Sequence, residues 1–374
     1  MSQIPFSSLA SVVAGIEPID PRHSVEAQLR LDNLTKPIGS LGRLEAIAAQ
    51  MFSIFAGRIP FPLQRAVYVF AADHGVTAEG VSAYPREVTA QMVHNFVAGG
   101  AAINVLARLH NVQLTVVDVG VDAEFEPAAG LCLMKMRRGS GNMLREPALT
   151  REDVTAAMEV GIRLAQSARD QGQTLVAVGE MGIGNTTSAS AIAAVLTKQQ
   201  IGGVTGRGTG LDPDGRNRKL SVLRRTMKRH FGASAETPEP LEILRCVGGL
   251  EIAAMTGFIL CAAANRMAVV CDGFISTAAA AIAYSLAHEV SGYLIAGHCS
   301  EEPGHRHLLR YIGLTPILNM GMRLGEGTGA VLAMPVIVSS VRLFSEMATF
   351  SSAGVSTASE GADSFKTLRR HFSF

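Results

Sequence analysis

The chain has 374 residues, of which 48% are hydrophobic, and its 33 Lys and Arg residues nearly balance 32 Asp and Glu residues to leave a net charge of +1. This length and composition predict a compact soluble protein with a large buried core and a second, smaller unit. Because no excess of positive charge is available to neutralise phosphates, we expect no nucleic-acid partner.

The first 20 residues lack a basic segment followed by an uninterrupted apolar stretch, so they do not have the pattern of a secretion signal. The later apolar stretches 277–287 and 329–339 are shorter than the ~20 residues that span a bilayer, and Pro335 interrupts the second. The five cysteines are odd in number and form no Cys-x-x-Cys pair, which favours free thiols. We therefore expect a cytoplasmic protein with no membrane role.

Both ends of the chain are predicted to be helical. Within residues 1–60, Leu, Ile and Ala recur at helical spacing on either side of a break at Lys36-Pro37. We expect a small helical domain built from residues 1–60 and 330–374, enclosing an α/β catalytic domain over residues 61–329. The Ser-, Gly- and Ala-rich stretch after about residue 355 is expected to be a poorly ordered tail.

Five short apolar runs in the centre of the chain are typical of buried strands, and each ends in glycine or a polar residue before a helical pattern begins. Such alternation predicts a doubly wound, mostly parallel, Rossmann-like sheet in a three-layer α/β fold, with helices on both faces. The five runs are AVYVF (66–70), QLTVV (113–117), TLVAV (174–178), MAVV (267–270) and GYLIA (292–296).

Ligands of open parallel sheets bind beyond the carboxyl ends of the strands. Several acids and histidines are predicted to lie there, and Asp in particular also caps helices, so capping and ligand contact are equally open for each acid. These residues are Asp73, His74, Asp118, Glu180, Asp272 and His298.

The segment after the first strand contains polar and soft apolar residues that could line a pocket for a flat aromatic ring. They are Ser82, Tyr84, Gln91 and Met92. His74 and His94 lack the spacing of known zinc motifs. The later segment GHCSEEPGHRH, which contains His298, Cys299, His305 and His307, is the best metal candidate by composition, yet its acids are typical of a helix start, and we expect no metal.

The turn after the third run begins with Gly179 and continues through Gly182, Ile183, Gly184, Asn185 and Thr186 into an alanine-rich helix. Glycines allow positive φ and close backbone approach, and a helix N-terminus presents unpaired N–H groups, so this turn is a candidate cradle for a single phosphate. It is neither a Walker loop nor a complete dinucleotide motif. The alternative is a tight turn that serves packing only.

A second glycine-rich loop contains Gly208 and four basic residues, Arg207, Arg216, Arg218 and Lys219, which could close over an anion or lie on a solvated surface. Further on, Glu326 lies between Gly325 and Gly327 in apolar sequence. Apolar surroundings raise the pKa of a carboxyl group towards the range of a general base. The alternative role of Glu326 is to complement the dipole of the following helix.

Six motifs occur in an order that closely resembles the nicotinate-nucleotide:dimethylbenzimidazole phosphoribosyltransferase family, over about residues 20–355. The motifs are LTKPIGSLGRLE, FAADHGVTAEGVSAYP, VGEMGIGNTTSASA, GRGTGLDPDGRNRK, DGFISTAAA and LGEGTGA. The resemblance implies transfer of phosphoribosyl from nicotinate mononucleotide to 5,6-dimethylbenzimidazole by a homodimer. The chemistry requires no metal or other cofactor.

The resemblance also implies residue roles. Glu326 is expected to be the general base, and Glu180 a second, electrostatic acid near the ribose. The phosphate is expected on Gly182, Ile183, Gly184, Asn185 and Thr186, with help from Gly208 and Lys219, and the base on Ser82, Gln91, Met92 and Leu324. Alternatives from the residues alone are a nucleoside phosphorylase, a ribosyl hydrolase, or a non-catalytic protein that binds a nucleotide or a benzimidazole and does not need Glu326.

Overall fold

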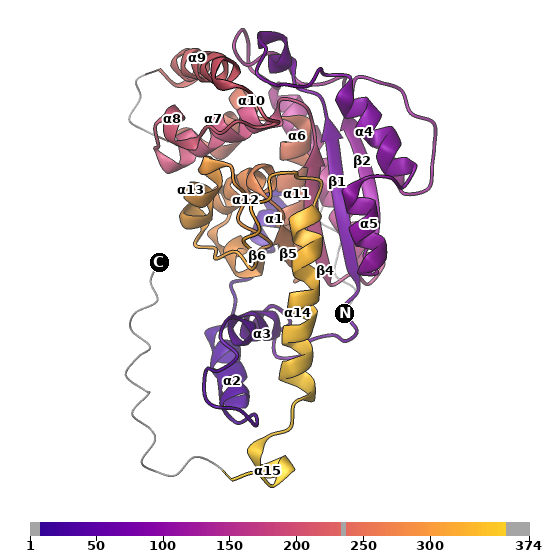
Figure 1. Cartoon of the computed structure of the whole chain (residues 1–374), viewed down its shortest axis with the longest axis vertical. Helices are drawn as coiled ribbons and strands as arrows, with labels where there is room; N and C mark the ends of the chain where they lie inside the picture. The colour runs from indigo at the N-terminus through magenta and orange to yellow at the C-terminus, as the bar shows by residue number, and fades with distance from the viewer. Residues whose placement is uncertain (1–7, 233–236, 357–374) are drawn as a thin grey trace.

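The computed structural model describes residues 8–232 and 237–356, which form an α/β core with a smaller helical unit beside it (Figure 1). The predicted tail falls mostly on residues 357–374, which lie outside the described residues.

A parallel sheet of six strands, in the order β3-β2-β1-β4-β5-β6, forms the centre of the molecule. The order reverses between β1 and β4, where connecting segments leave towards opposite edges and open a crevice at the carboxyl ends of the strands. The strands are β1 (Arg65–Ala72), β2 (Gln113–Gly120), β3 (Leu131–Leu133), β4 (Leu175–Met181), β5 (Ala268–Cys271) and β6 (Leu294–Ala296).

Helices cover both faces of the sheet, which confirms the predicted α/β fold class. α11 packs on one face of the sheet and is covered by α6, and α4, α5 and α14 contact strands from the other face. The helices are α1 (Leu9–Ala14), α2 (Pro21–Asp32), α3 (Arg43–Ile54), α4 (Val88–Val97), α5 (Ala102–Leu109), α6 (Arg151–Asp170), α7 (Asn185–Thr197), α8 (Ile201–Val204), α9 (Pro213–Phe231), α10 (Pro240–Val247), α11 (Leu250–Ala264), α12 (Phe274–Leu286), α13 (Pro303–Ile312), α14 (Thr328–Glu346) and α15 (Phe350–Ala353), with 3-10 turns η1 (Gly75–Glu79) and η2 (His288–Tyr293).

All five predicted strands are present, and the structure adds β3, which sequence analysis missed. β3 has only three residues and pairs with β2 at the edge of the sheet, where its side chains are partly exposed. A strand this short lacks the apolar run that marks a buried parallel strand, so its position depends on pairing with β2 and not on a local pattern.

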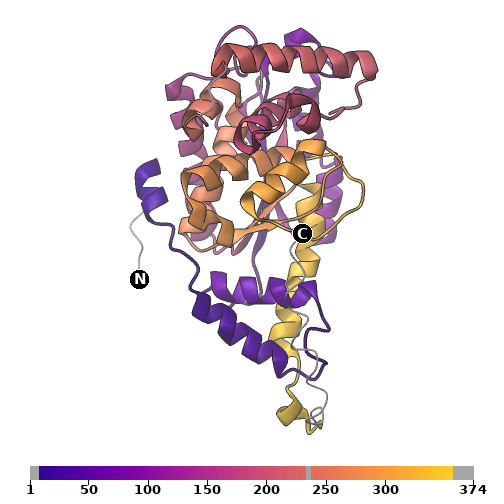
Figure 2. The same cartoon turned by 90° about the vertical axis from the view of Figure 1, so that its left-hand side faces the viewer.

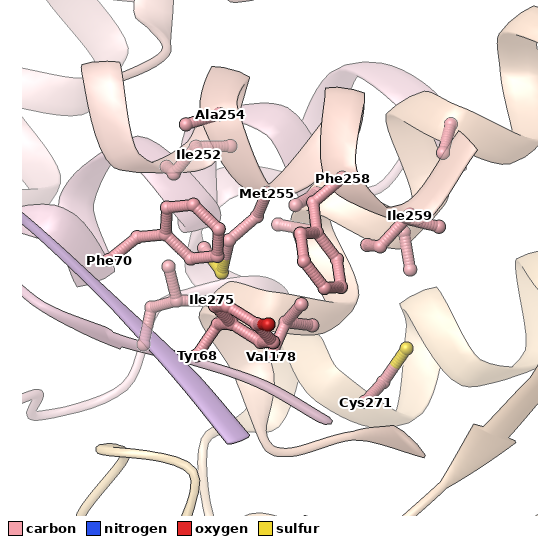
Figure 3. Packing of buried hydrophobic residues seen from close by; sticks show 14 of the residues in the cluster. Tyr68, Phe70, Val178, Ile252, Ala254, Met255, Phe258, Ile259, Cys271 and Ile275 are labelled. Carbon is pink, nitrogen blue, oxygen red and sulfur yellow. The ribbon is translucent and has the colours of Figure 1, made fainter. Parts of the chain in front are cut away.

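Aromatic side chains of α11 and β1 pack against each other and hold the helix on the sheet. The ring of Phe258 lies 4.7 Å from that of Tyr68 and 5.9 Å from that of Phe70, centroid to centroid (Figure 3). α11 in turn packs closely on α6, because a methyl group on Gly257 would lie 2.7 Å from the Met158 carbonyl carbon and one on Gly161 would lie 2.5 Å from the Phe258 nitrogen. Glycine is needed at both positions for this backbone approach.

A second, smaller core joins the two ends of the chain beside the lower half of α14 (Figure 2). The Phe52 ring of α3 packs on the Phe344 ring of α14 at 5.3 Å, and Lys36 forms a buried ion pair with Glu45 at 2.8 Å. The short α1 packs instead on α11 and α6 of the main body. The cluster consists of Ala27, Leu31, Leu34, Ala48, Phe52 and Phe344.

α14 is the one described helix that is long and apolar enough to cross a membrane by length and composition. The sequence predicts an interruption at Pro335, but α14 continues through this proline and has 19 residues in all. The proline removes one backbone hydrogen bond, and the buried neighbours Ala333, Met334 and Ile337 keep the helix packed against α3, α5 and the sheet. Packing inside the protein accounts for its apolar composition.

Candidate active site

A cavity of about 370 Å³ opens at the carboxyl ends of β4 and β5, next to the point where the strand order reverses. Its walls come from the turn after β4, the start of α4, the loop at Gly208, the start of α12, the segment after β6 and residues 323–326. A second cavity, at the start of α6, contains three arginines, of which Arg137 pairs with Asp153 and Arg245 with Glu242. The second cavity contains none of the predicted site residues.

Glu180 and Glu326 lie side by side in the first cavity. The Glu326 N–H donates to the Glu180 carbonyl oxygen at 3.3 Å, and a methyl group on Gly325 would overlap the Glu180 carboxyl group. The amide of Asn185, which begins α7, donates to the Glu180 carboxyl group. Asn185 therefore holds the first acid from within the predicted phosphate turn.

The backbone around Glu326 is unusual. Gly325, Glu326 and Gly327 have φ angles of 85°, 63° and 84°, a left-handed run that is unfavourable for the non-glycine residue in its centre. Asp272 holds the segment from below, because its carboxylate accepts from the N–H groups of Gly327 at 3.2 Å and Ala330 at 3.0 Å. Asp272, and not Glu326, therefore complements the dipole at the start of α14, which was the alternative role for Glu326.

Burial raises the pKa of Glu326 to about 7, with the Asp272 charge acting in the same direction and the Ile103 N–H opposing it. One carboxyl oxygen, Oε2, is buried and has no hydrogen-bond partner in the part of the chain that the structure describes. Burial, followed by the charges of Glu251 and Asp272, also holds the pKa of Glu180 well above its ordinary value. Glu326 can therefore exchange a proton near neutral pH.

The turn after β4 is tightly fitted. A methyl group on Gly182 would overlap the Ala72 carbonyl oxygen, and Gly184, with φ of 98°, caps α7. The Ile183 N–H donates to Thr89 Oγ1 at 3.1 Å, and the Asn185 N–H to the Gly182 carbonyl oxygen at 3.1 Å. Both amides are thus already bonded within the protein.

The His74 ring supports this turn from beneath. Its Cδ2 atom lies 3.4 Å from the position that a methyl group on Gly182 would take. Its Nε2 is 2.6 Å from Glu251 Oε1, and its Nδ1 is 3.2 Å from Ser188 Oγ in α7. These contacts account for His74 without a metal or a ligand.

Lys219 points inward from α9 and is fully buried. Its ammonium group donates to Thr186 Oγ1 at 2.8 Å, and a methyl group on Gly208 would lie 3.3 Å from Lys219 Nζ. Burial lowers the pKa of Lys219 to about 8, with Glu302 opposing and Arg216 reinforcing the shift. A cation therefore lies directly behind the Thr186 end of the cavity.

A family model described as phosphoribosyltransferase matches residues 16–355. The chain is 50% identical over 347 residues to the nicotinate-nucleotide–dimethylbenzimidazole phosphoribosyltransferase of Geobacter sulfurreducens, an alignment that covers 93% of this chain and 98% of the relative. The relative of the same name from Halalkalibacterium halodurans is 45% identical over 355 residues, an alignment that covers 95% of this chain and 98% of the relative. The chain belongs to the nicotinate-nucleotide–dimethylbenzimidazole phosphoribosyltransferase family.

The crystal structure of CobT from Thermus thermophilus agrees with this membership. It superposes with a TM-score of 0.85 at 45% identity, covering 90% of this chain and all of that chain. The family resemblance predicted from the six motifs is therefore confirmed.

Most of the predicted site residues meet at the cavity of this family member. Gly184 and Lys219 lie behind the wall, and two residues predicted for base binding do not line it: Ser82 is hydrogen-bonded to Thr209 at 3.2 Å, and Gln91 is exposed. Those that line the cavity are Glu180, Gly182, Ile183, Asn185, Thr186, Gly208, Met92, Leu324 and Glu326.

Other lining residues were missed by sequence analysis. Phe274, Ile275 and Ser276 begin α12 and form a largely apolar wall. Their signal was present in the DGFIST motif, which follows a strand end. Glu302 and Arg323 also line the cavity, but Glu302 precedes Pro303 and reads as a helix start, a position that it also occupies.

The remaining acids at the strand ends serve the backbone. Asp73 accepts from the Asp122 N–H at 2.8 Å, and Asp118 accepts from the N–H of Val121 at 2.9 Å. His305 binds Thr277 Oγ1 at 2.9 Å, and burial lowers its pKa to about 3. Structural hydrogen bonds therefore account for these groups.

Proposed function

We propose that this chain transfers the phosphoribosyl group of nicotinate mononucleotide to 5,6-dimethylbenzimidazole, giving α-ribazole 5′-phosphate and nicotinate. Relatives that match nearly the whole chain carry this activity in their names. The observation that carries the proposal is Glu326, a buried acid with an unpartnered oxygen in a cavity with an apolar wall and a cation behind its far end.

The phosphate of the donor is assigned to the end of the cavity formed by Gly182, Thr186 and Gly208. Lys219 supplies positive charge there, and a charge-assisted hydrogen bond to a phosphate oxygen is about twice as strong as a neutral one. Ile183, Gly184 and Asn185 shape the turn, and the bonded amides of Ile183 and Asn185 keep it rigid. The donor is thereby oriented with its ribose towards Glu180.

The acceptor ring is assigned to the opposite end, against Met92 and Leu324. As one ring nitrogen attacks the ribose, the other must lose its proton, and Glu326 takes it. A pKa of about 7 suits this role, because a base with a pKa near the working pH is both deprotonated and basic enough to contribute ~10²–10⁴-fold. Ser82 and Gln91 are assigned to the rim of this subsite and reach the ring only if their segment closes.

Loss of nicotinate leaves positive charge on the ribose ring in the transition state. This positive charge favours ionisation of Glu180, whose pKa burial holds above its ordinary value, and the ionised carboxylate, together with the Asp272 charge, lowers the barrier electrostatically. The Asn185 amide fixes the Glu180 carboxyl group in advance, so little reorganisation is needed during the reaction.

We also propose a cytoplasmic homodimer, with the small domain predicted over residues 1–60 and 330–374, except that α1 packs on the main body. Val25 and Leu29 support association, because they lie one helical turn apart on α2 and are 62% and 61% exposed. Light scattering of the wild type and of Leu29→Glu tests this. A dimer that the substitution dissociates is expected, and a monomeric wild type would contradict the proposal.

The experiment that tests the activity is incubation of the purified protein with nicotinate mononucleotide and a panel of flat azoles, followed by mass analysis. We expect α-ribazole 5′-phosphate when 5,6-dimethylbenzimidazole is present and negligible nicotinate release without an azole. Rapid release without an acceptor would indicate a ribosyl hydrolase, and donor binding without turnover would indicate a binding protein.

A further inference from the structure

A third acid of the cavity, Glu302, lies at the end that the proposed function assigns to the donor phosphate. It is 5% exposed and lies at the start of α13. Its Oε1 accepts from the Gly208 N–H at 2.8 Å, whereas its buried Oε2 has no hydrogen-bond partner among residues 8–232 and 237–356. A buried, half-satisfied carboxylate requires an explanation, because its desolvation is unfavourable.

Glu302 and Lys219 flank the same glycine without meeting. Gly208 bonds Glu302 through its N–H, and its α-carbon faces Lys219 Nζ. Within the described chain the two charged groups form no ion pair with each other; Lys219 is bonded to Thr186 Oγ1 instead. A phosphate bound next to Gly208 would therefore have the Lys219 ammonium group as a hydrogen-bond donor and the Glu302 carboxylate as an acceptor.

The other charged groups around Glu302 do not supply the missing donor. Arg216 of α9 donates to the Thr205 carbonyl oxygen at 3.0 Å, and Arg323 donates to the Gly208 carbonyl oxygen at 2.9 Å. His305 of α13 has its pKa lowered to about 3 by burial and by His298, so it is neutral near pH 7. Among the described residues no group supplies the hydrogen bond that Oε2 lacks, which leaves this oxygen available to a ligand.

A fully ionised phosphate ester has no proton to donate, and its charge would repel a buried carboxylate. We propose that Glu302 accepts a hydrogen bond from a monoprotonated phosphate of the donor, so that the site selects phosphate esters and rejects anions that carry no proton, such as sulfate. The inference rests on the proposed function. When the dianion binds, one proton is taken from solvent and shared between a phosphate oxygen and Oε2, and no covalent bond to carbon or phosphorus changes.

The second pKa of a phosphate ester is about 6, so only about a tenth of the free donor carries the required proton at pH 7. Donor affinity should therefore fall roughly tenfold per pH unit above that pKa. Replacement of the carboxylate by an amide removes the requirement, because the amide can donate to the dianion.

The test is calorimetric titration of the full-length protein with nicotinate mononucleotide at pH 7, in two buffers with different ionisation enthalpies. We expect the wild type to take up about 0.9 proton more on binding than Glu302→Gln does. Glu301→Gln is the matched control, because its exposed side chain lies outside the cavity. Glu326 is present in all three proteins, so its titration cancels in the difference. Loss of the Glu302 charge lowers the pKa of Lys219 further, so Lys219 takes up part of a proton when Glu302→Gln binds the donor, and about 0.9 proton is the upper limit of the difference.

Competition on the wild type keeps the test independent of the variant's folding. Inorganic phosphate should displace nicotinate mononucleotide, and sulfate should not do so at the same concentrations, whereas sulfate should compete in Glu302→Gln. Equal proton uptake in wild type and Glu302→Gln, or equal competition by sulfate and phosphate in the wild type, would overturn the inference. If the wild type does not bind the donor at all, the proposed function fails instead.

Discussion

Replacement of Gly179 by alanine tests whether the position of Glu326 is set by the strand beneath it. A methyl group on Gly179 would lie 2.6 Å from both the Glu326 carbonyl carbon and the Gly327 α-carbon, where ordinary contact begins at 3.4 Å. Both neighbours are backbone atoms, so they cannot rotate aside as the end of a side chain can. The segment that carries Glu326 must therefore move away from β4.

A displacement of about 1 Å at a reacting group lowers the rate by ~10²-fold, and overpacking of this kind destabilises a fold by ~1–3 kcal/mol. We expect Gly179→Ala to lower kcat about a hundredfold while the KM for nicotinate mononucleotide changes little, because Lys219 and the phosphate turn are untouched. Steady-state kinetics at 25 °C, with urea unfolding of the same samples, measures both effects.

Gly203→Ala is the matched control, since nothing lies within 4 Å of a methyl group there and the residue is in the short helix α8. It should keep wild-type kcat and stability. A Gly179→Ala protein that turns over at the wild-type rate would refute the reasoning, because Glu326 would then not depend on close contact with β4.

Two further predictions concern the cation and the core. Lys219→Met should raise the KM for the donor ~10–100-fold, the worth of ~1.5–3 kcal/mol for a hydrogen bond to a charged group; an unchanged KM would contradict the phosphate assignment. Because burial lowers the pKa of Lys219 to about 8, wild-type donor affinity should weaken more steeply as pH rises through that value, and a pH series on Lys219→Met should show only the decline that Glu302 imposes. Gly257→Ala should lower the free energy of unfolding by ~1–3 kcal/mol in urea titrations, because its methyl group would lie 2.7 Å from the Met158 carbonyl carbon; equal stability would show that α6 and α11 can separate freely.

Five of the six strands were accessible from the sequence because a buried parallel strand is continuously apolar. The run TLVAV predicted β4, and the glycines after it predicted a turn with polar residues at a helix start. Such local signals depend on a few consecutive residues. They were sufficient to place Glu180 and the turn that we propose binds phosphate at the carboxyl end of β4.

Contacts between distant segments could not be predicted in the same way. Nothing near Asp272 indicates that it bonds the N–H groups of Gly327 and Ala330, and nothing near Gly179 indicates the backbone that crosses it. Glu302 was missed for a different reason: its position before Pro303 has a sufficient local explanation as a helix start. The sequence indicates that Glu302 begins a helix, but it does not show that the same residue lines the cavity.

The central claim is that Glu326 removes the proton of the acceptor ring, and the pH dependence of kcat in the wild type and in Glu326→Gln tests it most directly. The wild-type rate should rise with pH through about 7 and then level off, as the carboxyl group loses its proton. Glu326→Gln should still bind nicotinate mononucleotide, turn over ~10²–10⁴-fold more slowly, and show no such rise. Turnover by Glu326→Gln at the wild-type rate, or with the same rise near pH 7, would contradict the assignment.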